Sequence, residues 1–281
     1  MSARRLLESA TSRLVEAGVA SPRHDAEVLL SHVTGTPRAL LTLTARVDDA
    51  QRRTYLEMIE ARARRVPLQH ITGTAAFRHV EVEVGPGVFV PRPETELLAG
   101  WAIDAAREVA STAGRVPVVV ELCAGSGAIS LSIVDEVPTA RVHAVELDEV
   151  AFGWARRNLD GTGVDLRLGD MAEAFGDLDG QVDVVVANPP YIPLEAWESV
   201  APEARDHDPA LALWSGADGL DAMRVVERVA WRLLRAGGVV GAEHADEQGE
   251  SAPAVFVERW SAVRDHEDLA GRPRYVTARR P

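Results

Sequence analysis

Four residues with polar or rigid side chains stand at the end of an apolar run. Asn188, Pro189, Pro190 and Tyr191 follow "VVVA" at residues 184–187. Proline donates no backbone hydrogen bond and fixes its own φ, so two consecutive prolines must end a β-strand here. Ending a strand requires neither an amide nor a phenol, however. The four residues are therefore either a rigid terminator or a stiff backbone that directs Asn188 and Tyr191 at a ligand.

A glycine-containing turn lies upstream, in the segment "ELCAGSGAIS" at residues 121–130. Gly125 and Gly127 fall between an apolar strand and the start of a helix, where glycines let backbone N–H groups approach a ligand closely. A turn chosen only for tight packing is the alternative. The spacing E-x-x-x-G-x-G, which begins at Glu121, differs from the G-x-G-x-x-G fingerprint of dinucleotide-binding proteins.

Acidic residues follow two further apolar segments. Glu146 is the last but one residue of the segment "ARVHAVEL", and a carboxylate at this place can accept two hydrogen bonds from a ribose diol. Capping of the next helix is the alternative, and it suits Asp148 better than Glu146. Asp170 and Met171 follow "VDLRLG". They are either an acceptor for an exocyclic amine and a cover for an adenine face, or ordinary turn and core residues.

The elements that must position these residues alternate regularly between apolar strands and helical patterns. Strands are expected at 116–123, 140–147, 164–170 and 182–191, and a helix at 219–235 precedes the later strands "GGVVGAEH" and "RYVTAR". Such alternation predicts a mostly parallel sheet covered by helices on both faces. Ligands of these sheets bind at the carboxyl ends of the strands, which is where the residues above are found.

The first quarter of the chain has a different pattern. From residue 3 to about 65 the apolar residues recur at helical spacing, and Gly18 and Gly35 stand where helices end. This pattern predicts a small helical bundle. From Thr74 to Val90 the apolar residues recur at every second position, as in "VEVEV", and "GPG" follows. This pattern predicts a β-hairpin between the two regions.

Charge and composition restrict the classes of function. Residues 1–80 hold 12 Arg against 8 Asp and Glu, whereas residues 81–281 hold 18 Arg against 35. The C-terminal region thus lacks the basic footprint of a nucleic-acid binder, and we expect no stable nucleic-acid binding. The single cysteine, Cys123, excludes an internal disulfide and a cysteine-based metal site. No run of 18 apolar residues occurs, so a cytoplasmic protein without membrane contact is expected.

Taken in chain order, these motifs resemble the S-adenosylmethionine-dependent glutamine-N5 methyltransferases that modify peptide chain release factors. The resemblance runs nearly from end to end. It is carried by the segments "RHDAEVLL", "RRVPLQHITGTAAF", "GPGVFVPRPETELL", "ELCAGSGAIS", "NPPYIP", "GADGLD", "EHADEQGES" and "GRPRYVTAR".

The resemblance implies an α/β fold with three parts. These are an N-terminal helical substrate-docking domain at 1–70, a β-hairpin linker at 71–92, and a seven-stranded, Rossmann-like methyltransferase sheet at 93–281. It implies S-adenosylmethionine as cofactor, with no metal. The residues implied to bind the cofactor are Glu121, Cys123, Ala124, Gly125, Ser126, Gly127, Glu146, Asp170, Met171 and Asn188. The family usually has glycine at position 123 and often an aromatic residue at position 171.

The resemblance also implies that Asn188, Pro189, Pro190 and Tyr191 hold the glutamine that receives the methyl group. A primary amide is a poor nucleophile, and positive charge develops on its nitrogen during transfer. Acceptors aimed at the two N–H groups therefore stabilise the transition state, and the side-chain oxygen of Asn188 and the carbonyl of Pro189 can supply them. Tyr191 either packs against the planar amide or is a buried structural residue.

Three alternatives stay open at this stage. The acceptor could be a glutamine of a ribosomal protein, or the exocyclic amine of adenine in a nucleic acid, which has the same planar geometry. The third is a non-catalytic protein that binds the cofactor as a scaffold, although such a protein has no need of Asn188 to Tyr191. Arg92 and Glu94 could line the cofactor entrance, but a role of Pro93 and Glu94 at a helix start explains the local sequence equally well.

Overall fold

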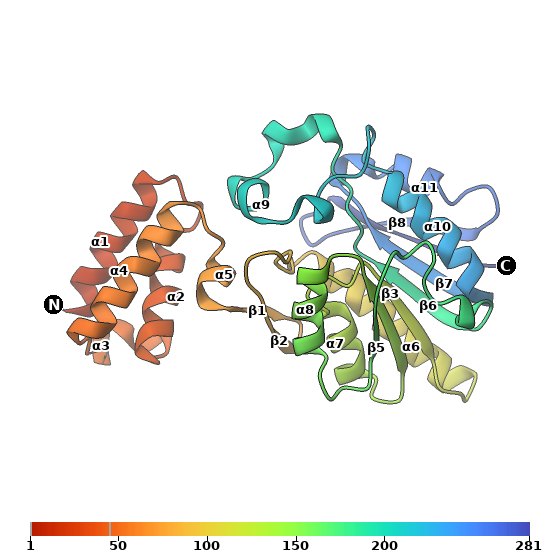
Figure 1. Cartoon of the computed structure of the whole chain (residues 1–281), viewed down its shortest axis with the longest axis horizontal. Coiled ribbons are helices and arrows are strands. Elements are labelled where there is room, and N and C mark those ends of the chain that lie inside the picture. The colour runs from red at the N-terminus through yellow and green to blue at the C-terminus, as the bar shows by residue number, and fades with distance from the viewer. Residues whose placement is uncertain (1, 45) are drawn as a thin grey trace. The chain divides into compact units, whose positions relative to one another are not determined.

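The computed structural model describes residues 2–44 and 46–281, which form two compact units (Figure 1). The helical unit extends to Thr74 and also includes Ala201–His207. The sheet unit comprises Ala75–Val200 and Asp208–Pro281. No helix in the described part of the chain is long and apolar enough to cross a membrane.

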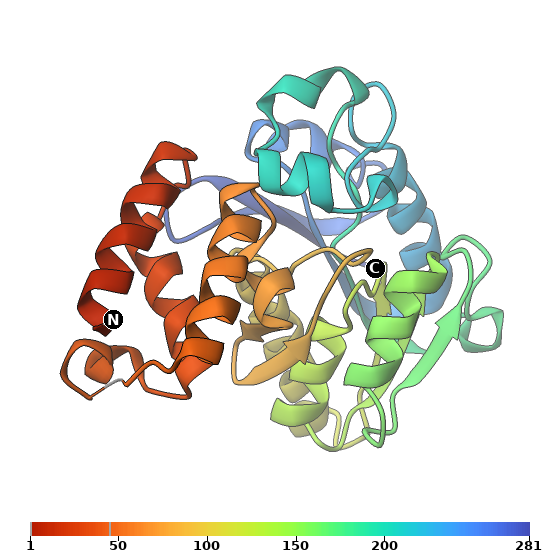
Figure 2. The same cartoon turned by 60° about the vertical axis from the view of Figure 1, so that its left-hand side comes forward.

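The helical unit is built from three longer helices, as the apolar spacing predicts. These are α1 (Ala3–Glu16), α2 (Pro22–Thr34) and α4 (Asp49–Ala63), which lie side by side in Figure 2. Their shared core contains Leu7, Leu29 and Tyr55, all fully buried. The short elements between and after them are η1 (Arg38–Leu40), α3 (Leu41–Thr44) and α5 (Leu68–Thr72).

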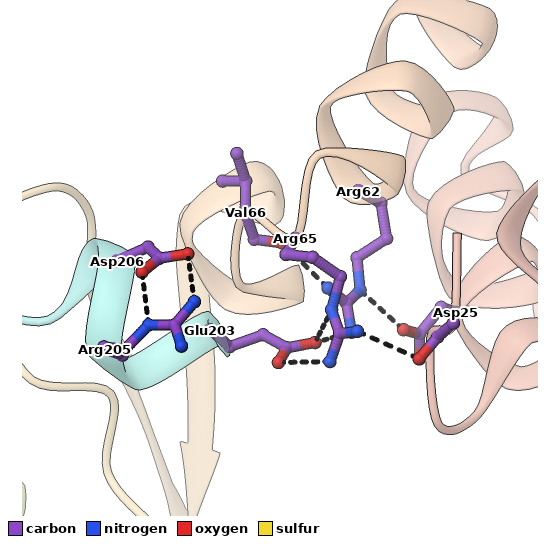
Figure 3. A network of polar contacts seen from close by, with 8 residues as sticks. Asp25, Arg62, Arg65, Val66, Glu203, Arg205 and Asp206 are labelled. Carbon is purple, nitrogen blue, oxygen red and sulfur yellow. Dashed lines mark hydrogen bonds and ion pairs between the residues drawn. The ribbon is translucent and has the colours of Figure 1, made fainter. Parts of the chain in front are cut away.

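A segment from much later in the chain completes this unit. The helix α9 (Pro202–His207) places Glu203 against two arginines from the end of α4 and just after it (Figure 3). Arg65 Nη2 donates to Glu203 Oε2 at 2.6 Å, and Arg62 Nη2 donates to Oε1 at 2.8 Å. Arg62 also donates from Nε to Asp25 of α2 at 2.7 Å. Residues 201–207 fall inside the range expected for the methyltransferase domain, yet they pack with the helical unit.

The sheet unit has a seven-stranded sheet with the strand order β5-β4-β3-β6-β7-β9-β8. The first five strands are parallel, and β9 runs antiparallel to both β7 and β8. The strands are β3 (Val118–Leu122), β4 (Arg141–Glu146), β5 (Asp165–Leu168), β6 (Val182–Ala187), β7 (Leu234–Glu243), β8 (Ser261–Glu267) and β9 (Pro273–Arg279). The predicted mostly parallel sheet is confirmed, whereas β8 was not expected from the sequence.

Helices cover both faces of this sheet, because successive strand side chains point to opposite sides. Val119 and Val184 pack with α6 (Thr95–Thr112), α7 (Ala128–Glu136) and α8 (Glu149–Asn158). Val120 and Val185 pack on the other face with α10 (Asp221–Leu233) and α11 (Ser251–Ala254). The neighbours α7 and α8 can be followed in both cartoons (Figures 1 and 2). Fully buried, apolar central strands form a rigid base for the loops at their ends.

The predicted hairpin is also present. It consists of β1 (Thr74–Phe77) and β2 (Val80–Glu83), which form a two-stranded sheet of their own. Phe77 and Val82 are buried in the same core as α6 and α7. The described part of the chain also contains the short 3₁₀ helices η2 (Gly176–Leu178), η3 (Leu194–Ser199), η4 (Ala210–Ala212) and η5 (Asp246–Gln248).

Candidate active site

The candidate site residues stand at the carboxyl ends of four neighbouring parallel strands. In sheet order, the end of β5 leads to Asp170 and Met171, β4 ends at Glu146, β3 leads to the turn 123–127, and β6 leads to Asn188. β6 stops at Ala187, because the backbone beyond it carries two prolines that cannot donate to a ladder. The parallel order therefore gathers residues that are up to 65 positions apart in sequence on one edge.

The turn between β3 and α7 has an unusual backbone. Cys123, Gly125 and Gly127 all have positive φ, at 61°, 55° and 79°. Glycine adopts this conformation without steric cost, whereas a residue with a Cβ atom does so at about 1 to 2 kcal/mol. The strain at Cys123 explains in physical terms why glycine suits this position. Ala124 N donates to Val145 O at 3.0 Å and thereby fixes the turn to β4.

Glu146 binds this turn directly. Its Oε2 accepts from Gly125 N at 2.7 Å, and its Oε1 accepts from Asp148 N at 2.9 Å. Asp148 caps α8 by accepting from Val150 N and Ala151 N, so the capping role falls to Asp148 and not to Glu146. Burial raises the pKa of Glu146, against the opposing effect of these backbone donors. Each carboxylate oxygen keeps acceptor capacity for a further donor.

Two sulfur atoms meet beside the turn. Cys123 Sγ lies 3.5 Å from Met171 Sδ, so the third strand end contacts the glycine turn. Burial, followed by the charges of Glu146, Glu121 and Asp170, raises the pKa of the Cys123 thiol. The thiol is therefore neutral and acts as an apolar group. Asp170 is exposed, and its Oδ1 accepts from Ala172 N at 2.8 Å.

Glu121 and Ser126 lie beneath this turn. Glu121 is only 1 % exposed, and its Oε2 accepts from Ser130 N at 2.9 Å and from the Ser130 hydroxyl. Burial raises the pKa of Glu121 to about 8. Ser126 is also buried, and its carbonyl accepts from Asn158 Nδ2 at 2.9 Å. In this structure both residues support the turn, and Glu121 joins β3 to the first turn of α7.

The side chain of Asn188 is held from one end. Its Nδ2 donates to the hydroxyl oxygen of Thr95 at 3.1 Å, at the start of α6. No hydrogen bond to Asn188 Oδ1 occurs within the described part of the chain, and the residue is partly exposed. Because the donor end is engaged, the acceptor end is left for a ligand. Thr95 was not expected in the site.

Tyr191 is held by a buried carboxyl group. Its hydroxyl donates to Glu243 Oε1 at 3.2 Å, where Glu243 ends β7. Burial, followed by the negative charge of Glu243, raises the pKa of Tyr191, so the phenol is neutral. Glu243 was also missed, although its place at the carboxyl end of the strand beside β6 is a signal that could have identified it.

A neighbouring loop fixes the backbone after the two prolines. Ile192 N donates to Leu213 O and Ser215 N donates to Ile192 O, both at 2.9 Å. Gln248 Nε2 donates to Tyr191 O at 3.1 Å. Gly219 has a φ of +76°, and a Cβ atom there would lie 2.3 Å from Tyr191 O. The segment "GADGLD" thus packs against this backbone so closely that only glycine fits.

Arg92 and two further polar residues form pairs away from these contacts. Arg92 Nη2 donates to Asp208 Oδ2 at 2.8 Å, which ties the segment before α6 to Asp208. Burial raises the pKa of Asp208 to about 6 despite the charge of Arg92. His244 is fully buried between Asp265 and Ala245 O. Among the described residues, no group of three or more His, Cys, Asp or Glu could hold a metal ion.

The observed geometry fits S-adenosylmethionine. A Cβ atom built on Gly125 would meet nothing within 4 Å, so space is open directly over the turn. Glu146, which borders that space, can accept from ribose hydroxyls, and Asp170 can accept from an amine. The carboxylates around Cys123 also make the local potential negative. A negative potential suits the sulfonium and ammonium charges of this cofactor.

Comparisons with known proteins agree with this fit. Residues 5–73 match the family described as PrmC N-terminal domain, and residues 107–201 match the family described as methyltransferase small domain. A release factor glutamine methyltransferase of Streptomyces coelicolor is 58% identical over 273 residues, which cover 96% of this chain and 95% of that one. The protein of the same description from Mycolicibacterium smegmatis is 44% identical, covering 99% and 97%.

A relative with another described activity is also similar. A 4-amino-L-phenylalanine/4-methylamino-L-phenylalanine methyltransferase of Streptomyces pristinaespiralis is 41% identical, covering 91% of this chain and 88% of that one. The identity to the Streptomyces coelicolor protein is clearly higher and includes the helical unit. The chain belongs to the release factor glutamine methyltransferase family.

Proposed function

We propose that this protein transfers a methyl group from S-adenosylmethionine to the side-chain amide nitrogen (N5) of a glutamine in class I peptide chain release factors. The glutamine is that of the Gly-Gly-Gln motif. One observation carries the proposal. The Asn188 amide is held through its nitrogen by Thr95, which directs its oxygen to a hydrogen-bond donor such as a substrate N–H.

The chain's residues divide into two groups in this proposal. The turn Cys123 to Gly127, including Ala124 and Ser126, holds the methionine part of the cofactor above Glu121. Glu146 holds the ribose, and Asp170 and Met171 hold the adenine. Asn188, Pro189, Pro190 and Tyr191 hold the acceptor amide. Asn188 borders both the cofactor and the acceptor amide. The cofactor supplies an electrophilic methyl group that needs no further activation.

The difficult part of the reaction is the attack by the glutamine amide nitrogen, which is a poor nucleophile. Asn188 Oδ1 and the Pro189 carbonyl would accept from the two substrate N–H groups, and their partial negative charges oppose the positive charge that develops on nitrogen. Neither is a base at neutral pH, so the proton is lost to water after transfer. In-line positioning can contribute about 7 to 11 kcal/mol to lowering the barrier in favourable cases. The two prolines, fixed by the loop 213–219, supply that rigidity.

The helical unit is proposed to dock the protein substrate. Residues 1–80 of the chain, most of which belong to this unit, hold an excess of arginine, in contrast to the acidic remainder, and a protein substrate needs contact area beyond a single side chain. The acidic sheet unit, which lacks a basic footprint, supports the absence of stable nucleic-acid binding. Action on a translation factor would place the reaction in the cytoplasm.

Competing acceptors are separated by one substrate panel. The protein is incubated with labelled cofactor and, in separate reactions, with a release factor, a ribosomal protein fraction, DNA, RNA or 4-amino-L-phenylalanine. The last of these tests the activity that the Streptomyces pristinaespiralis relative is described as having. Label in the release factor alone supports the proposal. Label confined to another acceptor, or cofactor binding without any transfer, would replace it by the corresponding alternative.

A further inference from the structure

Glu243 is a buried carboxyl group beside the proposed acceptor clamp. It is 1 % exposed and ends β7, which runs parallel to β6. Ala187 of β6 pairs with Ala242 of β7, so the next residues along the chain, Asn188 and Glu243, are neighbours at this edge of the sheet. Burial of a carboxyl group costs free energy unless neighbouring groups form hydrogen bonds with it. Its presence beside the clamp therefore needs an explanation.

The groups that face Glu243 come from four elements. Tyr191, in the loop after β6, donates to Oε1 at 3.2 Å, and Thr95 of α6 also interacts with the carboxyl group. The charged neighbours are Arg274 of β9 and Glu94, which precedes α6. Oε2 is buried and has no hydrogen-bond partner among the described residues. The carboxyl group thus binds Tyr191, one of the residues of the clamp.

An ionised carboxylate only accepts hydrogen bonds, and this fixes the direction of every bond that leads to it. Tyr191 must donate to it. This hydrogen bond holds the Tyr191 ring in one position within the clamp.

We propose that Glu243 is a positioning residue for methyl transfer, whose carboxylate fixes the orientation of Tyr191 in the acceptor clamp. This inference rests on the proposed function. Burial raises the pKa of Glu243 to about 7, against the opposing effects of Thr95, Arg274 and Tyr191. The ionised fraction therefore rises through the neutral range, and kcat is expected to rise with it.

The test compares pH profiles of kcat for the intact protein and for Glu243→Gln, which keeps the shape of the side chain and removes its charge. Wild-type kcat should rise to a plateau with an apparent pKa near 7. Glu243→Gln should lose this limb and lower the plateau about tenfold to a hundredfold, with KM for the cofactor little changed. The control is Glu227→Gln. Glu227 is another buried carboxyl group, which lies on α10 and accepts hydrogen bonds from Arg259 and Trp260.

Several outcomes decide the matter. An unchanged pH limb in Glu243→Gln, or a loss equal to that of Glu227→Gln, overturns the inference. Should Glu243→Gln fail to fold, Tyr191→Phe, which keeps the ring and removes its bond to Glu243, must reproduce the loss of kcat; full activity of Tyr191→Phe also overturns the inference. A wild-type protein that methylates no release factor refutes the proposed function instead, so the two failures are distinguishable.

Discussion

The side-chain nitrogen of Asn188 donates to the hydroxyl oxygen of Thr95 across 3.1 Å, at the junction of β6 and α6. This contact gives the polar residue after the strand a fixed orientation. It also divides the roles within the Asn-Pro-Pro-Tyr segment. The prolines end the strand and stiffen the backbone, whereas Asn188 and Tyr191 are each held by a buried partner that the segment itself does not contain.

Removal of the Asn188 amide should slow turnover without loss of the cofactor. Asn188→Ala is expected to lower kcat by about 10² to 10³, the usual cost of one aimed hydrogen-bonding group in an active site. Cofactor Kd, measured by calorimetry, should change far less. The control is Gln181→Ala, an exposed amide at the opposite end of β6, which should leave kcat unchanged. Equal losses in kcat and cofactor affinity would contradict the assigned role.

A methyl group on Gly125 tests the cofactor position. Gly125→Ala should cost about 1 to 2 kcal/mol of folding stability, because alanine is strained at φ +55°. Cofactor affinity should fall by much more than tenfold, since the new atom would enter the open space over the turn. Gly163→Ala has a similar φ of +81° and a similarly open Cβ position, and should cost only stability. The same Kd in both variants would place the cofactor elsewhere.

Replacement of the Glu146 carboxylate should weaken cofactor binding selectively. Glu146→Gln puts an amide donor where Gly125 N and Asp148 N need acceptors, so a loss of about 1.5 to 3 kcal/mol in binding is expected. This corresponds to about tenfold to more than a hundredfold in Kd. Glu149→Gln, three residues along in the exposed first turn of α8, is the matched control. An unaltered Kd in Glu146→Gln would remove Glu146 from the ribose site.

The ion pairs of Glu203 should stabilise the association of residues 201–207 with the helical unit. Although burial opposes it, hydrogen bonds from Arg65 and Arg62 lower the pKa of Glu203 to about 2, below the ordinary value of 4.5. A lowered carboxyl pKa contributes stability that is present above about pH 4.5 and is lost as the pH falls toward 2. Amide hydrogen exchange in residues 201–207 should therefore accelerate over that interval in the wild-type protein.

The matching substitution can be measured at neutral pH. Glu203→Gln should reduce the free energy of local unfolding of residues 201–207 by about 1.5 to 3 kcal/mol, because it weakens bonds from two guanidinium groups. Asp206→Asn, which loses a partly exposed pair with Arg205, should have a much smaller effect. Equal exchange rates in the two variants would show that the Glu203 pairs do not hold this segment.

Much of the sheet could be predicted from local sequence. The apolar runs at 116–123 and 182–187 identify central strands, and the alternation with helices leads to a parallel sheet with its ligand edge at the strand ends. β8 was missed because Ser261–Glu267 contains four charged or histidine side chains and is mostly exposed or half-buried. An edge strand of that composition lacks the apolar pattern on which the prediction depends.

The partners of the site residues could not be read from the sequence. Thr95 contacts Asn188 across 93 positions, and Glu243 contacts Tyr191 across 52. These pairings arise only when β6 and β7 lie side by side beneath the start of α6. The same is true of Arg62 and Glu203, which are 141 positions apart and bring residues 201–207 into the helical unit. Long-range pairs of polar groups leave no local periodicity to detect.

The most direct test of the proposed function is the location of the transferred methyl group. Release factor treated with the protein and isotopically labelled S-adenosylmethionine is digested, and its peptides are fragmented in a mass spectrometer. The account predicts one labelled methyl group on the side-chain nitrogen of the glutamine in the Gly-Gly-Gln peptide, with the signal strongly reduced for Asn188→Ala. Label on any other residue, or equal labelling by the wild-type protein and Asn188→Ala, would contradict it.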